Sequence, residues 1–294
     1  MHGRGPRWLA PLAVVLIWGV NVPVMKGALE HAHAFGFNAA RLTASVLVLG
    51  ILDRLERRGE PAPATPWRAV LLLALMTSLL YQVLFSLGIT RTSATHAGFL
   101  IASGPLWTAG IASAVGLERL GRRAWIALAI AFVGTCTVVV AKGGGGTVTR
   151  ADSLAGNGIL LASMLVWALG TILTRPVLAE FPATRLAYLT TLVALPGHWL
   201  LGWRHLAAEW RGFTPGIWGA VLYSGALSTG IAYSLWNRSL LRIGPARTSA
   251  FTNLVPLIAL VVAWGTLGER LSALQLLGGA LVWIGLGTWR SARR

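Results

Sequence analysis

Long apolar runs, separated by short charged or Gly/Pro-rich breaks, dominate the chain. The runs reach about twenty residues, the length that an α-helix needs to cross a hydrocarbon core roughly 30 Å thick. They lack the two-residue alternation of barrel strands, and in hydrocarbon every backbone N–H and C=O must be paired within the protein. The pattern therefore predicts an all-α integral membrane protein with ten transmembrane helices, at Trp8–Met25, Phe35–Leu52, Ala69–Thr90, Ser93–Leu117, Arg123–Ala141, Leu154–Leu178, Ala183–Leu206, Pro215–Asn237, Pro245–Leu267 and Ser272–Trp289.

The composition excludes an ordinary soluble domain. Hydrophobic residues make up 55% of the chain, charged residues only 12%, and the mean hydropathy is +0.67, whereas soluble domains carry about 25% charged residues. The N-terminus begins with a basic stretch and an apolar run, as a signal peptide does. Because that run continues past Pro23 with no small-x-small cleavage site, we expect a retained first helix.

The formal charge of +16 comes almost entirely from arginine in the short segments between apolar runs. Placing the N-terminus in the cytoplasm puts 17 basic residues on the inner side and 7 on the outer side, the distribution that the positive-inside rule describes. This predicts a multi-pass protein of the bacterial inner membrane with both termini cytoplasmic. A membrane explains the charge, so no nucleic-acid partner is expected.

The two halves of the chain resemble one another. Gly104–Leu120 aligns with Val255–Leu271 at a constant offset of 151, and both segments end in Glu-Arg-Leu. The same offset pairs Pro105 with Pro256, Gly134 with Gly285 and Gln82 with Tyr233, and an offset of 149 pairs Trp18 with Trp167. We therefore predict two domains, residues 1–146 and 147–294, with five helices each. Because five is odd, the second half enters the membrane from the opposite side, and such a 5+5 inverted-topology repeat allows alternating access.

These residues also indicate a family. The chain resembles the EamA-type members of the drug/metabolite transporter superfamily, and most of all its bacterial exporters of aromatic amino acids. The resemblance lies in the two Pro-x12-Glu-Arg-Leu segments, in the early Trp of each half and in the pattern of small residues before the proline in Thr248–Pro256. The resemblance implies a ten-helix bundle around a central cavity that acts as a secondary transporter and needs no cofactor or metal.

Polar and aromatic residues at mid-depth in the predicted helices are the candidates for substrate contact. Trp18 lies about ten residues into the first helix, hence about 15 Å deep, where an interfacial aromatic belt does not explain it. Core packing is an alternative of roughly equal weight for each such residue. The substrate-binding candidates are Trp18, Asn21, Tyr81, Gln82, His96, Trp107, Trp167, Tyr233, Trp236 and Asn253, and the hinge or gate candidates are Pro23, Pro105 and Pro256, with Pro105 and Pro256 expected to interrupt their helices in mid-span.

Charged residues give a further constraint. All nine acidic residues lie at the ends of predicted spans or in loops, so no midplane carboxylate is available for a proton relay and we expect a facilitator or a weakly coupled exporter. We interpret Arg41, near the outer end of its span, as a side chain that snorkels toward water. Glu118 and Glu269, which begin the two Glu-Arg-Leu segments, are expected to be structural and to pair locally with Arg119 or Arg270.

The function that these features predict is export or facilitated passage of amino acids, aromatic or otherwise neutral, and of related small metabolites. Export of other organic solutes, such as hydrophobic cations attracted to aromatic faces, is an alternative within the same class. A lipid-modifying membrane enzyme would need clustered nucleophiles, bases or metal ligands, and a scaffold subunit would need no polar groups at mid-depth. The expected partners are a small-molecule substrate and the lipid bilayer, and the protein is a monomer or a homodimer.

Overall fold

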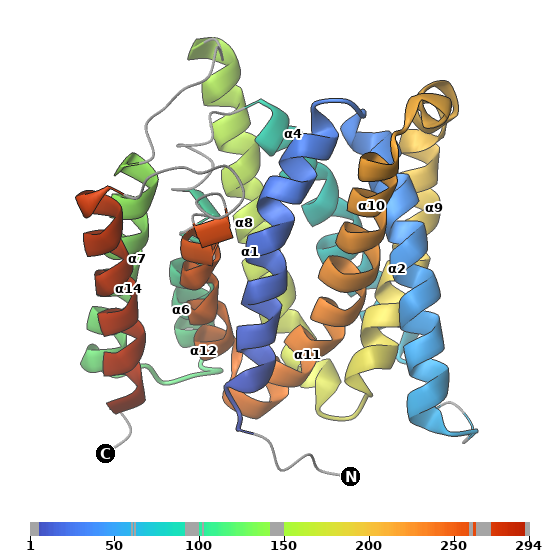
Figure 1. Cartoon of the computed structure of the whole chain (residues 1–294). Helices are drawn as coiled ribbons and strands as arrows, with labels where there is room; N and C mark the ends of the chain where they lie inside the picture. Colours follow the sequence, from blue (N-terminus) through green and yellow to red (C-terminus); the bar gives the residue numbers. More distant parts are fainter. Residues whose placement is uncertain are drawn as a thin grey trace. The chain divides into compact units, whose positions relative to one another are not determined.

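The structure is a computed structural model, and it describes residues 6–59, 61, 63–91, 100–101, 103–141, 150–258, 261–262 and 272–291. Every regular element within these residues is helical, which confirms the all-α prediction (Figure 1). The elements of the first half are α1 (Leu9–Leu29), α2 (Ala34–Arg57), α3 (Trp67–Leu73), η1 (Ala74–Leu80), α4 (Tyr81–Thr90), α6 (Gly104–Ala114) and α7 (Arg122–Ala141). Those of the second half are α8 (Arg150–Leu178), α9 (Ala183–Glu209), η2 (Trp210–Gly212), α10 (Pro215–Leu222), η3 (Tyr223–Ile231), α11 (Ala232–Ile243), α12 (Pro245–Ala250), η4 (Phe251–Leu254) and α14 (Ala273–Ser291).

Four helical segments among the described residues are long and apolar enough to cross a membrane. They are Leu9–Leu29, Ala34–Arg57, Trp67–Thr90 and Leu154–Leu178, and each falls on one of the predicted spans. The first half's third span is continuous through α3, η1 and α4. The ten-helix 5+5 arrangement stays a prediction, as do the domains 1–146 and 147–294, whose boundary falls outside the described residues.

A widened, π-helical stretch occurs at matching places in the two halves. In the first half it is η1, Ala74–Leu80, and the sequence offset of 151 carries that range onto residues 225–231, inside η3. A π-helical turn alters the backbone hydrogen-bond ladder and is often found at functional sites. Both stretches flank the polar residues described below.

Two compact units make up the chain, and each takes helices from both halves. The first contains residues 1–83 and 173–243, and the second contains residues 84–172 and 244–294. In the first unit α2 packs along α9. Their close approach depends on Gly202, because a Cβ there would collide with the carbonyl oxygen of Phe35.

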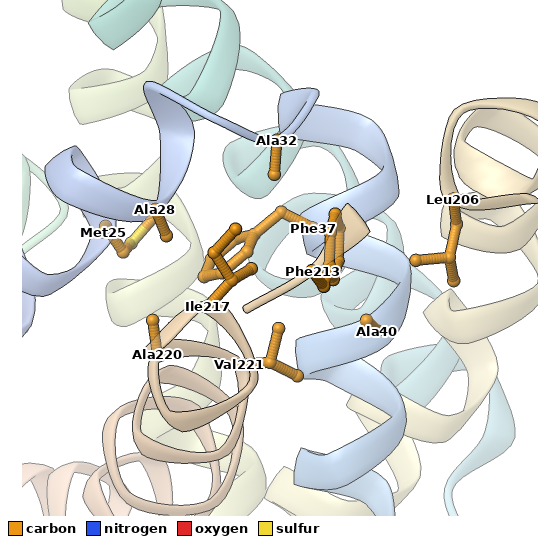
Figure 2. Packing of buried hydrophobic residues seen from close by; sticks show 10 residues of the cluster. All are labelled: Met25, Ala28, Ala32, Phe37, Ala40, Leu206, Phe213, Ile217, Ala220 and Val221. Carbon is orange, nitrogen blue, oxygen red and sulfur yellow. The ribbon is translucent and has the colours of Figure 1, made fainter. Parts of the chain in front are cut away.

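Figure 2 shows an apolar cluster of the first unit where the ends of α1 and α9 meet α2 and α10. Phe37 on α2 is completely buried, and its ring lies next to Phe213 and Ile217. This cluster fixes α1 and α10 against α2, and these helices continue toward the polar residues of the unit. Its members are Met25, Ala28, Ala32, Phe37, Ala40, Leu206, Phe213, Ile217, Ala220 and Val221.

In the second unit α7 and α14 lie side by side (Figure 1). The contact has matching halves: a Cβ on Gly134 would lie 2.7 Å from the carbonyl oxygen of Gly278, and one on Gly285 would lie 2.7 Å from the carbonyl oxygen of Ala127. The two glycines are the pair that the repeat predicted. Small residues let membrane helices approach closely enough for van der Waals packing to hold them.

Both repeated prolines lie where a regular α-helix begins, directly after a turn or a 3-10 segment, and their proposed role as hinges stays a prediction. Pro105 is in the first turn of α6, and Pro256 lies in the helical residues 255–258 directly after the 3-10 turn η4. Proline suits the first turn of a helix because the N–H that it lacks has no intrahelical acceptor there. Pro23, by contrast, lies inside α1.

Glu118 holds the start of α12, while the predicted pairing of the Glu-Arg-Leu segments stays a prediction, because Glu269 and Arg270 lie outside the described residues. Its Oε1 accepts the backbone N–H of Ala246 at 3.3 Å. The preceding Gly244 has φ +86°, and a Cβ there would collide with the Glu118 carboxylate. This Glu-Arg-Leu segment therefore fixes the entry of α12.

Candidate functional site

The first unit brings aromatic side chains from α1 and α11 together. The indole of Trp18 packs on that of Trp236, with ring centroids 5.1 Å apart, and meets the edge of the Tyr233 ring at 6.3 Å. Its Nε1–H donates to the carbonyl oxygen of Ser228 in η3 at 2.9 Å. Such pairs stabilise a packed aromatic surface beyond their buried area. Trp18 thus has its polar end satisfied and its faces against other rings.

Tyr233 is also hydrogen-bonded to the residue with which the repeat pairs it. The Nε2–H of Gln82, at the start of α4, donates to the Tyr233 hydroxyl oxygen at 2.8 Å. Gln82 is 4% exposed and Tyr233 is 8% exposed. Positions predicted to be equivalent in the two halves are therefore in direct contact.

Arg41 completes this site, and the prediction that it snorkels is wrong. Its side chain is buried, with 2% exposure. The guanidinium donates from Nη2 to Gln82 Oε1 at 2.7 Å, from Nη1 to Thr229 Oγ1 at 3.0 Å and from Nε to Asn38 Oδ1 at 2.8 Å. Snorkelling fails because three polar partners inside the unit hold the head group.

These contacts close into a ring. Trp18 contacts Tyr233, Tyr233 bonds Gln82, and Gln82 bonds Arg41, while Arg41 and Trp18 hold the neighbouring η3 residues Thr229 and Ser228. The ring joins α1, α2, α4, η3 and α11. It links the Arg41 cation through Gln82 to the aromatic residues Tyr233 and Trp18.

The cation of Arg41 has only neutral partners. The ion pairs among the described residues are Arg57–Asp53, Arg185–Asp53 and Arg238–Glu56, and none includes Arg41. A buried cation without a counter-ion is costly unless hydrogen bonds or an anion compensate it. The site therefore has positive charge available to an anionic group.

Asn21 adds an open acceptor. It follows Trp18 by three residues on α1 and is 8% exposed. Its Oδ1 is buried with no hydrogen-bond partner among the described residues. Residues three apart share a helix face, so this acceptor lies on the side of α1 that carries Trp18. Tyr81, which precedes Gln82, is half-buried.

The remaining candidates lie outside the first unit or outside the described residues. Trp107, Trp167 and Asn253 belong to the second unit. Trp107 is 39% exposed and donates to Ser103 of its own segment. The buried Asn253 amide donates to Ala250 O and lies 3.3 Å from Thr135 Oγ1, so it ties η4 to α7. His96 lies outside the described residues.

A shallow groove of about 340 Å³ on the first unit is lined by tryptophan and aliphatic side chains, unlike the polar ring. It is lined by Trp199, Trp203, Leu206, Ala207, Trp210 and Trp218. The four indoles are between 39% and 50% exposed. Exposed tryptophans near a helix end are typical of the membrane–water interface, so we place no substrate there.

Two groups of charged or titratable residues lie at the ends of the first unit's helices. Asp53, 3% exposed, bonds Arg185 at 3.0 Å and Arg57 at 3.2 Å, and next to it Glu56 pairs with Arg238.

At the start of α2 the ring of His33 stacks on that of His205, with centroids 3.5 Å apart. The backbone N–H of His33 donates to Glu209 at 2.8 Å. Burial and the neighbouring His205 lower the pKa of His33, and Glu209 opposes this change.

The apolar spans are those of an integral membrane protein, and the buried polar ring is its candidate solute site. The profile of the EamA-like transporter family matches the chain twice, over residues 8–140 and 154–288. The chain belongs to this family of membrane transporters.

Named relatives and one solved structure agree with this assignment. A "Probable terminal-alkyne amino-acid exporter" of Streptantibioticus cattleyicolor is 29% identical, over 93% of this chain and 89% of that protein. A "Probable amino-acid metabolite efflux pump" of Salmonella typhimurium is 25% identical, over 94% of this chain and 91% of that protein. One crystal structure matches with a TM-score of 0.82 at 17% identity, covering 97% of this chain and 98% of that one, which shows the fold alone.

Proposed function

We propose that this transporter exports neutral amino acids and related small metabolites across the bacterial inner membrane, by alternating access of two inverted five-helix repeats. The ring around Arg41, Gln82 and Tyr233 carries this proposal. It offers hydrogen-bonding groups and aromatic surface together, buried inside a helical unit, and a small amphipathic solute needs both.

The contact between Gln82 and Tyr233 supports the inverted repeat. Equivalent positions of two related halves touch only close to the axis that relates them. The matching π-helical stretches η1 and η3 and the reciprocal glycine contacts of α7 with α14 support the same symmetry. Paired interruptions at corresponding places mark the substrate site in inverted-repeat transporters.

The charge of the site favours amino acids over hydrophobic cations. A cationic drug would meet the buried Arg41 guanidinium, which has no carboxylate partner among the described residues. Like charges in a low-dielectric interior repel strongly. The amino-acid exporters among the relatives support the same choice.

A substrate panel in proteoliposomes tests the proposal. Vesicles containing the purified protein are loaded with unlabelled solute, and uptake of labelled solute is followed for Phe, Trp, Thr and a hydrophobic cation, against protein-free vesicles. We expect counterflow of at least one neutral amino acid and none of the cation. Counterflow of the cation alone would overturn the proposed substrate class.

The orientation is tested separately. Cys136 is the only cysteine of the chain, so a Cys136→Ser background accepts single cysteines at either end for labelling with a membrane-impermeant maleimide. We expect both termini to be protected in intact spheroplasts and labelled after lysis. Labelling of one terminus in intact spheroplasts would contradict the inverted repeat.

A further inference from the structure

We propose that Arg41 binds the carboxylate of an α-amino acid and that Asn21 accepts its ammonium group, so that the protein selects zwitterions over the corresponding amines. This inference rests on the proposed function, because it names the part of an amino acid that the site recognises. The juxtaposition that carries it joins two buried groups: a guanidinium with no carboxylate partner among the described residues, linked through Gln82 and Tyr233 to Trp18, and an amide oxygen on the Trp18 face of α1 that has no hydrogen-bond partner among those residues.

The Arg41 guanidinium has N–H groups that are not used in the hydrogen bonds to Asn38, Thr229 and Gln82. It carries five N–H groups, and three of them are used, one each to Asn38, Thr229 and Gln82. Each terminal nitrogen therefore retains one N–H. Arginine characteristically binds a carboxylate through two parallel hydrogen bonds, and the neutral partners of Arg41 hold its plane in place without neutralising its charge. The group is positioned for an anion that the described protein residues do not supply.

Asn21 provides the complementary acceptor. A buried polar atom without a partner is destabilising, because it has lost its hydrogen bonds to water. A substrate ammonium would restore that bond to Oδ1. Since Asn21 shares a helix face with Trp18, an ammonium bound to it would also lie near the Trp18 and Trp236 rings, which attract cations.

The aromatic rings take the apolar remainder of the substrate. The rings of Trp18, Tyr233 and Trp236 lie in tilted and T-shaped contact and form an apolar surface that suits an aromatic or aliphatic side chain. Specificity from polar groups exceeds specificity from apolar fit, because a substrate that lacks the expected partner leaves buried groups unpaired. The carboxylate of the substrate therefore determines whether a compound binds, and the side chain of the substrate changes its affinity.

Counterflow in proteoliposomes with three related compounds tests this assignment. L-Phenylalanine has both charged groups, L-phenylalaninamide has lost the carboxylate, and N-acetyl-L-phenylalanine has lost the ammonium group. We expect the wild-type protein to show a KM for phenylalaninamide about 10- to 100-fold above that for phenylalanine, the loss of a charge-assisted hydrogen bond. The N-acetyl compound should show a comparable loss.

Variants locate the effect. Arg41→Gln should raise the KM for phenylalanine about 10- to 100-fold and leave the KM for the amide within about threefold. Asn21→Leu should raise the KM for phenylalanine and leave that of the N-acetyl compound unchanged. Arg41→Lys, which keeps the charge and loses the planar pair of donors, should keep part of the preference. Arg204→Gln, at an exposed arginine of α9, is the matched control and should leave every KM unchanged.

The outcomes separate the two proposals. Equal KM values of the wild-type protein for phenylalanine and its amide would overturn the assignment of Arg41, while amino-acid transport would stand. An equal rise for both compounds in Arg41→Gln would also overturn it, since a purely structural arginine would act on all substrates alike. Counterflow of none of the three compounds by the wild-type protein would overturn the proposed function and this inference with it. If Arg41→Gln does not fold, the wild-type comparison of the compounds still decides.

Discussion

Replacing Gly134 with alanine should push α7 and α14 apart. The new Cβ would lie 2.7 Å from the carbonyl oxygen of Gly278 and 2.8 Å from both the Leu281 Cβ and the Val282 nitrogen. Ordinary contacts begin at 3.4 Å, so α14 must retreat by about 0.7 Å. Two of these atoms belong to the backbone, so no rotamer change relieves the contact. Overpacking of this kind costs about 1–3 kcal/mol.

The size of the effect follows from that cost. At about 2–4 °C per kcal/mol, we expect Gly134→Ala to lower the Tm in detergent by roughly 2 to 12 °C. Gly285→Ala should lower it by a similar amount, because its Cβ would lie 2.7 Å from the Ala127 oxygen. The double variant should lose less than the sum, since one retreat of the helix relieves both contacts.

Gly110→Ala is the matched control. Gly110 lies inside α6 in the same unit, and nothing lies within 4 Å of a Cβ placed on it. Alanine is favoured over glycine in a helix by about 1 kcal/mol, so this variant should keep or raise the Tm. Fluorescence-detected size-exclusion after heating gives the Tm of all four variants. If Gly134→Ala is as stable as Gly110→Ala, the close contact of α7 with α14 is refuted.

Further changes should affect stability in ways that depend on burial and pH. The pKa of His33 in the folded protein lies below its ordinary 6.5, so the folded state binds fewer protons than the unfolded state. The Tm should therefore fall as the pH drops below about 6.5, and His205→Gln should make this fall smaller. Equal slopes of Tm against pH in the wild type and His205→Gln would contradict this prediction. Asp53→Asn should destabilise by about 1.5–3 kcal/mol because it removes the buried charge with which two partly buried arginines form ion pairs. Glu56→Gln, at a half-exposed pair, should cost about 1 kcal/mol or less, and equal Tm losses would refute the ranking. Glu118→Ala should cost about 0.5–2 kcal/mol by removing the cap of α12, and a Tm equal to that of the wild type would show that the cap contributes nothing.

The helices and half of the ring were predictable from sequence. Apolar runs of about twenty residues fix helix positions because backbone groups in lipid must be paired internally. Trp18 was found because its depth excludes the interfacial explanation. The pairing of Gln82 with Tyr233 followed from the repeat register, and the structure joins the two side chains at 2.8 Å.

Arg41 was missed for a physical reason. An arginine near a span end has two stable outcomes, snorkelling to water or burial among polar partners, and its own helix does not distinguish them. The partner that does, Thr229, is 188 residues away in sequence. One signal was available in the charge count. The 17 inner and 7 outer basic residues leave out one of the 25 in the chain, and this residue is Arg41, which lies inside a predicted span.

Counterflow of labelled phenylalanine tests most directly whether the ring of the first unit is the transport site. Wild-type protein, Trp18→Ala and Trp283→Ala are compared at equal reconstituted amounts, where Trp283 is a 64% exposed indole of α14. We expect Trp18→Ala to lose at least about tenfold in kcat/KM, from a lost aromatic contact and hydrogen bond, and Trp283→Ala to match the wild type. Equal transport by Trp18→Ala and the wild type would contradict this account.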